Sequence, residues 1–336
     1  MSGNETILEV RNLKKYFFSG KKRRGREPRA VKALDGVSFS MEYGETLGVV
    51  GESGCGKSTL GRTILRLHEP TEGQVVYRGK NLAEYGREEM RQMRRELQII
   101  FQDPYSSLNP RMTVRELICA PLDVFAMGSK EEKEARVIEI MDKVGLPLEF
   151  MNRYPHEFSG GQRQRIVIAR ALVLNPRFVV CDEPVSALDV SVRAQVLNLM
   201  MDLQKELDLT YLFISHDLSV VRYICDRIMV MYLGQLVEKC ESEELFAHTL
   251  HPYTQALLSA IPTVDLDNRK EQILLKGELS SPINPKPGCR FASRCPYAKE
   301  ECTRTSPEIR EILPDHFVAC HYVEEINGLE KKERKS

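Results

Sequence analysis

The sequence predicts an α/β fold, because apolar strands alternate with helical patterns along most of the chain. Four continuous apolar runs have the composition of strands that a parallel sheet buries on both faces. These runs are LQIIF (97–101), RFVVC (177–181), TYLFI (210–214) and RIMVM (227–231). A glycine-rich turn begins at Gly51, and a helix is expected to follow it from about Lys57.

Composition sets limits on what the chain can be. It has 336 residues, 42% of them hydrophobic, which is enough for one large or two moderate domains. The 48 Lys and Arg residues balance 48 Asp and Glu residues, so no global field draws the chain to nucleic acid or to an anionic membrane. No stretch reaches the length of a membrane helix, and the first residues lack a signal-peptide pattern. We therefore expect a cytosolic chain without a transmembrane segment.

The remaining elements follow from local patterns. Strands are predicted at 7–18 and 31–50, and the basic stretch KKRRGREPR (21–29) between them is expected to be a solvated loop. Helical periodicity replaces strand patterns over 103–174, and a further helix is predicted over 191–207. After about Pro262 the chain is rich in proline and has little periodicity, which predicts a separate loop-rich module.

The segment GESGCGKS (51–58) has the pattern of a P-loop in the context that a P-loop requires, between an apolar strand and a helix. Glycines let backbone N–H groups and the helix N-terminus converge on phosphate oxygens, Lys57 reaches the β and γ phosphates, and Ser58 can bind Mg²⁺. The predicted nucleotide-binding residues here are Gly51, Glu52, Ser53, Gly54, Cys55, Gly56, Lys57, Ser58 and Thr59.

Two carboxylates complete the chemistry that a P-loop needs. Asp182 ends a predicted buried strand and can hold Mg²⁺ directly or through water. Glu183 beside it can orient or deprotonate the attacking water. Together with the P-loop, this pair predicts nucleotide hydrolysis.

Further motifs resemble those of ATP-binding-cassette (ABC) ATPases. FSGGQRQR (158–165) resembles the family's signature motif, IIFQDP its Q-loop, SALDVS its D-loop and FISHDL its switch-histidine segment. The resemblance implies nucleotide contacts from Tyr16, which would stack on adenine, and from Ser159, Gly160, Gly161, Gln162 and Asp189. It also implies that Gln102 contacts Mg²⁺ and senses the γ phosphate, that Glu183 is the base and that His216 is the switch histidine.

The implied fold is a P-loop NTPase cassette: a RecA-like core with an N-terminal antiparallel β part and a helical subdomain. The predicted domains are a cassette at 1–260 with its helical subdomain at about 103–174, a cysteine-bearing extension at 261–323 and a disordered tail at 324–336. The signature motif of one cassette would face the ATP of a second, so that two cassettes close head to tail around two nucleotides.

Longer segments, including FQDPYSSLNPRMTV and LHPYTQALLSAIP, are similar to the F-type ATP-binding subunit of oligopeptide and dipeptide permeases, from about residue 7 to 323. That resemblance implies a peripheral subunit at the cytoplasmic face of the cell membrane, bound to two permease subunits, with the segment 103–114 at the permease contact. A homologous D-type cassette is the expected partner, the alternative being a second copy of this chain, and an extracytoplasmic binding protein would deliver peptide.

Four cysteines in the last fifty residues, Cys289, Cys295, Cys302 and Cys320, are separated by five, six and seventeen residues. This is not the short knuckle of structural zinc sites, so the spacing leaves zinc, an iron–sulfur cluster and inert buried thiols open. The family resemblance implies a [4Fe–4S] cluster.

Two other functions compete with transport. The first is a soluble ABC ATPase whose cysteine module binds zinc and nucleic acid, which the acidic residues of the tail disfavour. The second is a structural cassette that binds ATP only to hold a dimer together, which intact Glu183 and His216 disfavour.

Overall fold

The computed structural model describes residues 5–19, 29–261, 272–275 and 281–330, and the chain divides into two compact units. The first unit comprises Met1–Leu8, Ser40–Thr46 and Val76–Ser215. The second comprises Glu9–Phe39, Leu47–Val75 and His216–Ser336. Most of the basic stretch that was expected to form a solvated loop, residues 20–28, lies outside the described residues.

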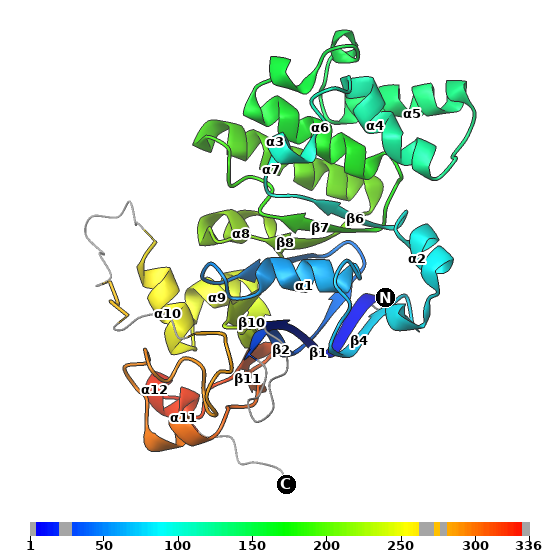
Figure 1. The fold of residues 1–336 in the computed structure, drawn as a ribbon. Helices are drawn as coiled ribbons and strands as arrows, with labels where there is room; N and C mark the ends of the chain where they lie inside the picture. Colours follow the sequence, from blue (N-terminus) through cyan, green and yellow to red (C-terminus); the bar gives the residue numbers. More distant parts are fainter. Residues whose placement is uncertain (1–4, 20–28, 262–271, 276–280, 331–336) are drawn as a thin grey trace. The chain divides into compact units, whose positions relative to one another are not determined.

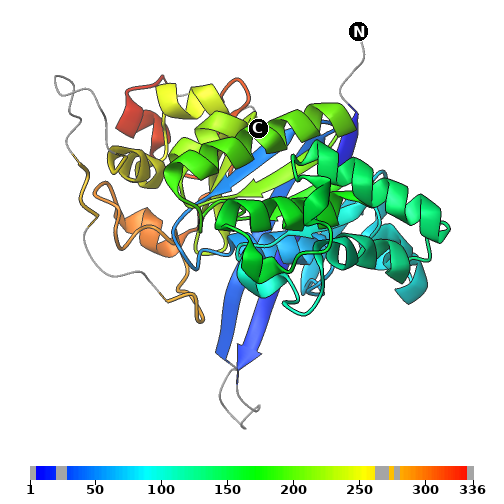
Figure 2. The same cartoon turned by 90° about the horizontal axis from the view of Figure 1, so that it is seen from above.

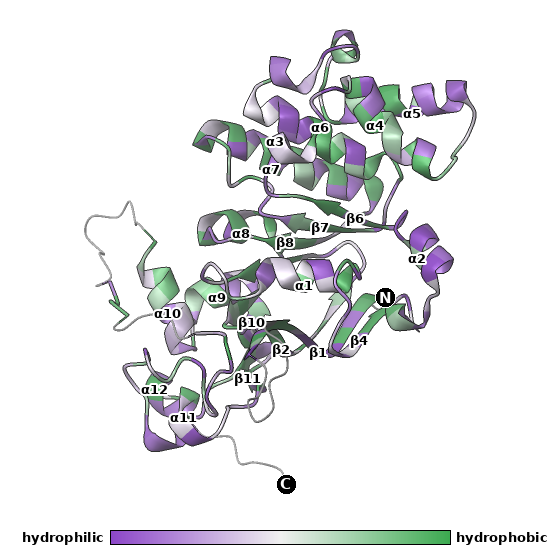
Figure 3. Cartoon of the chain, in the orientation of Figure 1, coloured by the Kyte–Doolittle hydropathy of each residue, from purple (hydrophilic) through white to green (hydrophobic). Residues whose placement is uncertain are grey.

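The first unit contains parallel strands with the order β8-β7-β6. Their bounds are β6 Leu97–Ile100, β7 Phe178–Asp182 and β8 Thr210–Ile214. Every residue of β7 and β8 is buried, as their continuous apolar composition predicts, and Figure 3 colours these strands as hydrophobic. Because β7 ends at Asp182, the sheet brings the predicted carboxylates to the carboxyl edge of its strands.

Helices dominate the rest of the first unit, and those of the predicted helical segment lie together in Figure 1. Their bounds are α2 Arg87–Met93, α3 Pro104–Ser107, α4 Val114–Val124, α5 Lys130–Lys143, α6 Gly160–Leu172 and α7 Val190–Leu207. Reciprocal capping explains where several of them begin: Thr113 with Glu116 starts α4, and Ser129 with Glu132 starts α5. At its other end α7 stops at Asp208, whose left-handed backbone (φ 51°) cannot continue a helix.

The second unit contains a mixed sheet with the order β11-β12-β10-β9-β3. Strands β3 and β9 are parallel, whereas the pairs β9–β10, β10–β12 and β12–β11 are antiparallel. The bounds are β3 Thr46–Val50, β9 Arg227–Tyr232, β10 Gln235–Glu241, β11 Arg310–Leu313 and β12 His316–Val318. An α/β fold with one mixed and one antiparallel sheet confirms the predicted fold class.

The antiparallel sheet is built on the two long strands β1 (Thr6–Ser19) and β2 (Arg29–Glu42), which run side by side in blue in Figure 2. Most of each strand belongs to the second unit, where β4 (Glu72–Tyr77) lies on the other side of β1. In the first unit the end of β4 pairs with β5 (Lys80–Asn81). The helices of the second unit are α1 Lys57–Ile64, α8 Leu218–Ile224, α9 Ser242–Ala247, α10 Pro252–Ser259, α11 Glu300–Arg304 and α12 Val323–Asn327.

The C-terminal segment differs from the separate, loop-rich module that its composition predicts. Strand β12 adds to the edge of β10, with Val318 opposite Glu238. Val318 and Val323 pack with Leu250 and Ile312 in a small aliphatic core, so this segment shares its core with the chain before residue 261. Strands of three and four residues carry too few side chains for a visible period, which is why the sequence did not reveal them.

The prediction of a disordered tail over 324–336 is wrong for residues 324–330. Helix α12 begins at Val323, and Glu324 is buried and accepts a hydrogen bond of 2.6 Å from Arg310. Helix α12 ends at Asn327, before Gly328 in a left-handed conformation (φ 65°). Residues 331–336 lie outside the described residues.

Candidate active site and cysteine cavity

The predicted P-loop is a turn that only glycine can complete at two of its positions. It connects β3 to α1 within the second unit. Gly51 and Gly56 have φ values of 149° and 110°. A Cβ atom on Gly51 would lie 2.2 Å from the carbonyl oxygen of Met231, and one on Gly56 would lie 2.2 Å from that of Ala33. The turn therefore has the tight, open-backbone form that a phosphate cradle requires.

The side chain of Lys57 folds back into this turn. It is buried, with 6% of the residue exposed. The ammonium group donates hydrogen bonds to the carbonyl oxygens of Gly51 (2.7 Å) and Glu52 (3.1 Å). An ammonium group within the turn, beside the N-terminus of α1, is the charge arrangement that attracts phosphate.

The other P-loop residues complete the fit to a nucleotide. Ser53 and Gly54 are exposed, Ser58 and Thr59 in the first turn of α1 are half-buried, and Cys55 is buried. Burial raises the pKa of the Cys55 thiol, so it stays neutral near Lys57. A backbone cradle, a lysine and helix-start hydroxyl groups fit a nucleoside triphosphate with Mg²⁺ in donor set and charge.

Tyr16, the predicted adenine contact, lies in β1 of the second unit and is held at both its hydroxyl and its ring. Its hydroxyl donates a hydrogen bond to Asp35, and the ammonium group of Lys32 lies 5.2 Å from its ring centroid. Burial and the Asp35 carboxylate raise the pKa of the Tyr16 hydroxyl, which therefore remains protonated. The anchored hydroxyl fixes the ring plane.

The predicted carboxylates lie in the first unit at the end of β7. Asp182 is buried, with 2% exposed, and Glu183 follows with a left-handed backbone (φ 51°), which is uncommon for a glutamate. Gln102 donates a hydrogen bond of 2.9 Å from its side-chain nitrogen to the Glu183 carboxylate. The structure thus brings the predicted base and the predicted Q-loop glutamine together, although they are 81 positions apart.

The signature segment opens α6 in the same unit. Ser159 is the N-cap, and its hydroxyl accepts from the backbone N–H of Gln162, whose side chain accepts in return from the N–H of Ser159. A Cβ atom on Gly161 would lie 2.4 Å from Val192 of α7, so this glycine allows close helix packing; Gly160 precedes it in the first turn of α6. Exposed Asp189 is the N-cap residue of α7.

His216 belongs to the second unit and is exposed just before α8. Its neighbour Asp217 caps that helix by accepting N–H groups of Ser219 and Val220 at 3.0 and 3.4 Å. These two hydrogen bonds fix the backbone beside His216 at the start of α8.

The four predicted cluster cysteines line one small cavity in the second unit. The cavity has a volume of about 20 Å³, roughly the space of one water molecule, and His251, Phe291 and His321 also line it. Burial raises the pKa of the thiols of Cys289 to about 11 and of Cys320 to about 12, and it also raises that of Cys295. Without a bound cation Cys289, Cys295 and Cys320 are therefore neutral thiols at pH 7.

The number of donors around this cavity and the spacing of those donors give different answers on whether it can hold a metal. Four thiols around one cavity equal in number the thiolate ligands of a [4Fe–4S] cluster. Among the described residues, no group of three or more His, Cys, Asp or Glu side chains is close enough to hold a metal ion. The geometry of the described residues therefore does not support the predicted [4Fe–4S] cluster.

Sequence reasoning missed the side chains that hold the P-loop and Tyr16 in place. Arg294 forms an ion pair of 2.8 Å with Glu52, and Tyr253 accepts a hydrogen bond of 2.8 Å from the N–H of Glu52. Arg290 pairs with Asp35, the acceptor of the Tyr16 hydroxyl. The only sequence signal is that each arginine stands beside a cysteine, in the order CRFASRC.

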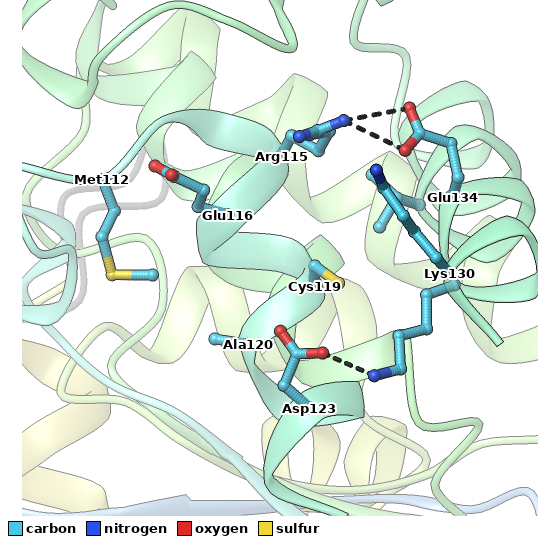
Figure 4. A pocket seen from close by; sticks show the side chains of 10 residues that line it. Met112, Arg115, Glu116, Cys119, Ala120, Asp123, Lys130 and Glu134 are labelled. Atoms are coloured by element: carbon cyan, nitrogen blue, oxygen red, sulfur yellow. Dashed lines mark hydrogen bonds and ion pairs between the residues drawn. The ribbon is translucent and has the colours of Figure 1, made fainter. Parts of the chain in front are cut away.

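A groove of about 410 Å³ lies over α4 and α5 in the first unit (Figure 4). Ion pairs Arg115–Glu134 (3.1 Å) and Lys133–Asp123 (2.6 Å) link the two helices across it, with Met112 and Cys119 among its lining residues. Met112 belongs to the segment that was predicted to contact a permease. Among the described residues, no helix is long and apolar enough to cross a membrane.

Comparisons with known proteins agree with these features. Residues 34–186 match the family described as "ABC transporter", and residues 237–302 match "Oligopeptide/dipeptide transporter, C-terminal region". The chain is 55% identical to the oligopeptide transport ATP-binding protein AppF of Bacillus subtilis, covering 95% of this chain and 98% of that protein. It is 53% identical to the dipeptide transport ATP-binding protein DppF of Haemophilus influenzae, covering 96% and 98%.

A solved structure is similar over the cassette. It is a dimeric post-hydrolysis state of the ATP-binding cassette MJ0796 bound to ADP and Pi. Its sequence is 30% identical, its TM-score is 0.62, and the match covers 70% of this chain and 99% of that chain.

Proposed function

Because the chain belongs to the ATP-binding subunits of oligopeptide and dipeptide ABC transporters, which are ATPases, we propose that it powers peptide import as one half of a head-to-tail cassette dimer. The observation that carries the proposal is the P-loop turn, with glycines at two sterically closed positions and Lys57 inside. Similarity over nearly the full length of transport ATP-binding proteins supports the peptide class of cargo. The nucleic-acid alternative gains no support from these relatives.

Each predicted residue has a role in this proposal. Backbone N–H groups of 51–59 and Lys57 bind the phosphates, and Tyr16 stacks on adenine. Mg²⁺, held by Ser58, Gln102 and Asp182, would neutralise charge that develops on the phosphates. Glu183 accepts the proton of the attacking water, and His216 interacts with the γ phosphate.

The hydrogen bond from Gln102 to Glu183 supports a link between phosphate sensing and the base. While Gln102 holds the Glu183 carboxylate, one of its oxygens is engaged. Breaking this hydrogen bond would make that oxygen available to accept a proton from water. The Q-loop therefore controls when the base is available.

Dimerisation would supply the second phosphate contact. Ser159 and Asp189 are exposed at the N-termini of α6 and α7, which favour anions, although the chain already has one phosphate cradle. We assign Ser159, Gly160, Gly161 and Gln162 to the nucleotide of the partner cassette. The dimeric state of the MJ0796 cassette supports this assignment by similarity.

We further propose a homologous D-type cassette as the partner and two membrane permease subunits as the docking site, which would hold the chain at the cytoplasmic face of the membrane. An extracytoplasmic binding protein would deliver the peptide to the permease. The segment 103–114 is proposed to contact the permease because it follows Gln102 directly in the chain, and the groove over α4 and α5 because Met112 of this segment lines it. Tyr105, with 61% exposed and Arg163 lying 4.0 Å from its ring centroid, is a suitable contact residue.

Reconstitution tests the function. We expect low ATPase activity from the chain alone and an activity well above the additive rate when the D-type cassette, the permease pair and the peptide-binding protein are added in liposomes. Uptake of a labelled peptide should require ATP and should be lost in Lys57→Ala, together with ATP affinity. Normal ATP affinity of Lys57→Ala would contradict the phosphate cradle, and ATPase activity without peptide uptake would contradict the transport role.

The four cysteines are proposed to hold a [4Fe–4S] cluster. Iron, acid-labile sulfide and zinc per chain after anaerobic purification test this, with Cys302→Ser compared against Cys119→Ser from the first unit. About four iron and four sulfide, lost only in Cys302→Ser, are expected. Stoichiometric zinc, or neither metal, would exclude the cluster.

A further inference from the structure

A C-terminal segment, residues 281–295, lies against the nucleotide-binding elements of the second unit, and we call it the C-terminal strap. At its start it pairs with the beginning of β2: Ile283 bridges Val31, and the N–H of Lys32 donates to the carbonyl oxygen of Pro282 at 3.1 Å. The N–H of Asn284 donates to the carbonyl oxygen of Ala30 at 3.0 Å. The strap therefore begins as a short extended segment that pairs with β2, the strand that contains Asp35.

Arg290 of the strap contacts Asp35, the residue that accepts the hydrogen bond from the Tyr16 hydroxyl. Its guanidinium group pairs with Asp35 and also donates to the carbonyl oxygen of Leu233, and the arginine side chain is only 6% exposed. Asp35 accepts from Tyr16 through its other carboxylate oxygen. The position of the predicted adenine-stacking ring therefore depends on a residue of the strap.

Arg294 reaches the P-loop itself. Its guanidinium group donates to both carboxylate oxygens of Glu52, at 2.8 and 3.1 Å, and contacts the hydroxyl of Tyr232 at 3.4 Å. The side chains of Arg294 and Glu52 are 10% and 21% exposed, so this pair is poorly screened by solvent. Tyr253 accepts from the N–H of Glu52, so the second residue of the P-loop is held at its backbone and at its side chain.

The opposite side of the strap faces the cysteine cavity. Cys289 and Cys295 line that cavity, each beside one of the two arginines. Phe291 between them is 1% exposed, and its ring lies 5.3 Å from Tyr232 and 5.5 Å from Tyr253. Phe291 thus links the packing of the cysteines to Tyr232 and Tyr253, which contact Arg294 and Glu52, and close-packed side chains transmit displacement.

We propose that Arg294 is a positioning residue for ATP binding that acts through Glu52, and that the C-terminal strap thereby couples the cysteine cavity to the nucleotide site. The inference rests on the proposed role of residues 51–59 in binding phosphates. A carboxylate within the turn repels phosphate unless a cation neutralises it and fixes its direction. Arg294 supplies both effects from a segment that is more than 230 residues away along the chain.

The test compares ATP affinities of the purified full-length chain by titration calorimetry with ATP and Mg²⁺. We expect Arg294→Gln to weaken binding about tenfold or more, within the usual range of coupling between two sites. Arg304→Gln is the matched control, because Arg304 is 72% exposed in the same C-terminal segment and forms its ion pair with exposed Glu300. The control should bind ATP as the wild type does.

A double variant separates positioning from simple loss of folding. If Arg294 acts by neutralising Glu52, then Glu52→Gln combined with Arg294→Gln removes the repulsion and restores affinity to within about threefold of wild type. Arg294→Lys should retain part of the affinity, because it keeps the charge and loses the planar guanidinium group whose Nη1 contacts both carboxylate oxygens of Glu52. If the double variant binds as weakly as Arg294→Gln, Glu52 is not the group through which Arg294 acts and the proposal is overturned.

Amide hydrogen exchange of peptide 288–296 tests the coupling to the strap by a readout that is independent of hydrolysis. ATP should slow exchange there in the wild type and in Arg304→Gln, and much less in Arg294→Gln. Unchanged exchange in the wild type would refute the coupling. If the wild-type chain fails to bind ATP at all, the proposed function fails, whereas ATP binding that is unaffected by Arg294→Gln overturns this inference alone.

Discussion

His251 gives the chain a predictable loss of stability in acid. It is the N-cap of α10, 1% exposed, and its Nδ1 accepts the N–H of Tyr253 at 3.1 Å. Burial lowers the pKa of His251 from 6.5 to about 4, although the nearby Glu238 carboxylate and a hydrogen bond to the backbone of Ala319 act in the opposite direction. The neutral imidazole is therefore the form that the native structure requires.

The sign and size of the effect follow from proton linkage. Between pH 6.5 and 4 the unfolded chain binds a proton at His251 and the folded chain does not, so the free energy of unfolding decreases as the pH falls through this window. Below pH 4 both states are protonated and the decrease stops. At pH 4 the loss relative to pH 7 is about 3 kcal/mol, because each pKa unit corresponds to about 1.4 kcal/mol.

Amide hydrogen exchange of peptides from α10 measures this loss directly, once corrected for the intrinsic pH dependence of exchange. The wild type should lose about 3 kcal/mol more opening free energy between pH 7 and pH 4 than His251→Gln, which keeps a donor and an acceptor but does not titrate. Val318→Ala, a buried change in the same region, lowers stability at all pH values and should keep the wild-type slope. Equal slopes in the wild type and His251→Gln would refute the reasoning.

Three further changes follow from the structure. Glu183→Gln should lower the rate of phosphate release about 10²- to 10⁴-fold while ATP affinity is retained, and unchanged turnover would remove Glu183 from the base role. Gly161→Ala should lower the free energy of urea unfolding by about 1–3 kcal/mol, because the added Cβ atom would clash with Val192. In Gly160→Ala the nearest contact of the added Cβ atom is at 3.4 Å, so this change should be neutral or stabilising, and equal effects of the two changes would contradict the packing argument. Glu238→Gln should lower the free energy of unfolding by about 3–5 kcal/mol, because the fully buried Glu238 accepts from His316 and two backbone N–H groups. The exposed control Lys299→Gln should lower it by less than about 1 kcal/mol in urea unfolding, and an equally small loss for Glu238→Gln would show that the Glu238–His316 pair is dispensable.

The strands of the fold could be predicted from the sequence wherever composition or period is strong. Strands β7 and β8 coincide with the predicted runs to within one residue, because four consecutive apolar side chains in each are typical of a strand buried on both faces. Helices α5 and α7 follow from the helical spacing of their apolar side chains. Strands β11 and β12 did not follow, since their place depends on pairing with β10 and not on a local pattern.

The residues of the candidate site likewise fall into those that the sequence identifies and those that it does not. The P-loop residues could be named because the backbone geometry of the turn requires glycines at fixed positions, and the structure leaves no room for a Cβ atom at two of them, Gly51 and Gly56. Gln102 was identified through family resemblance, and the structure places its side chain against Glu183. Arg294, Arg290 and Tyr253 could not be found, because contacts between distant segments leave no periodic signal in one sequence.

The C-terminal segment has a structural role that its composition conceals. Without β12, strand β10 would expose an unpaired edge, and Glu238 would lose the 2.8 Å contact with His316 while it remained buried beside Leu250 and His251. Without the strap, Glu52 would lose its ion pair to Arg294. Both consequences fall on the second unit, which also carries the P-loop, so the chain after residue 261 belongs to the structural basis of nucleotide binding and is more than an appendage that carries four cysteines.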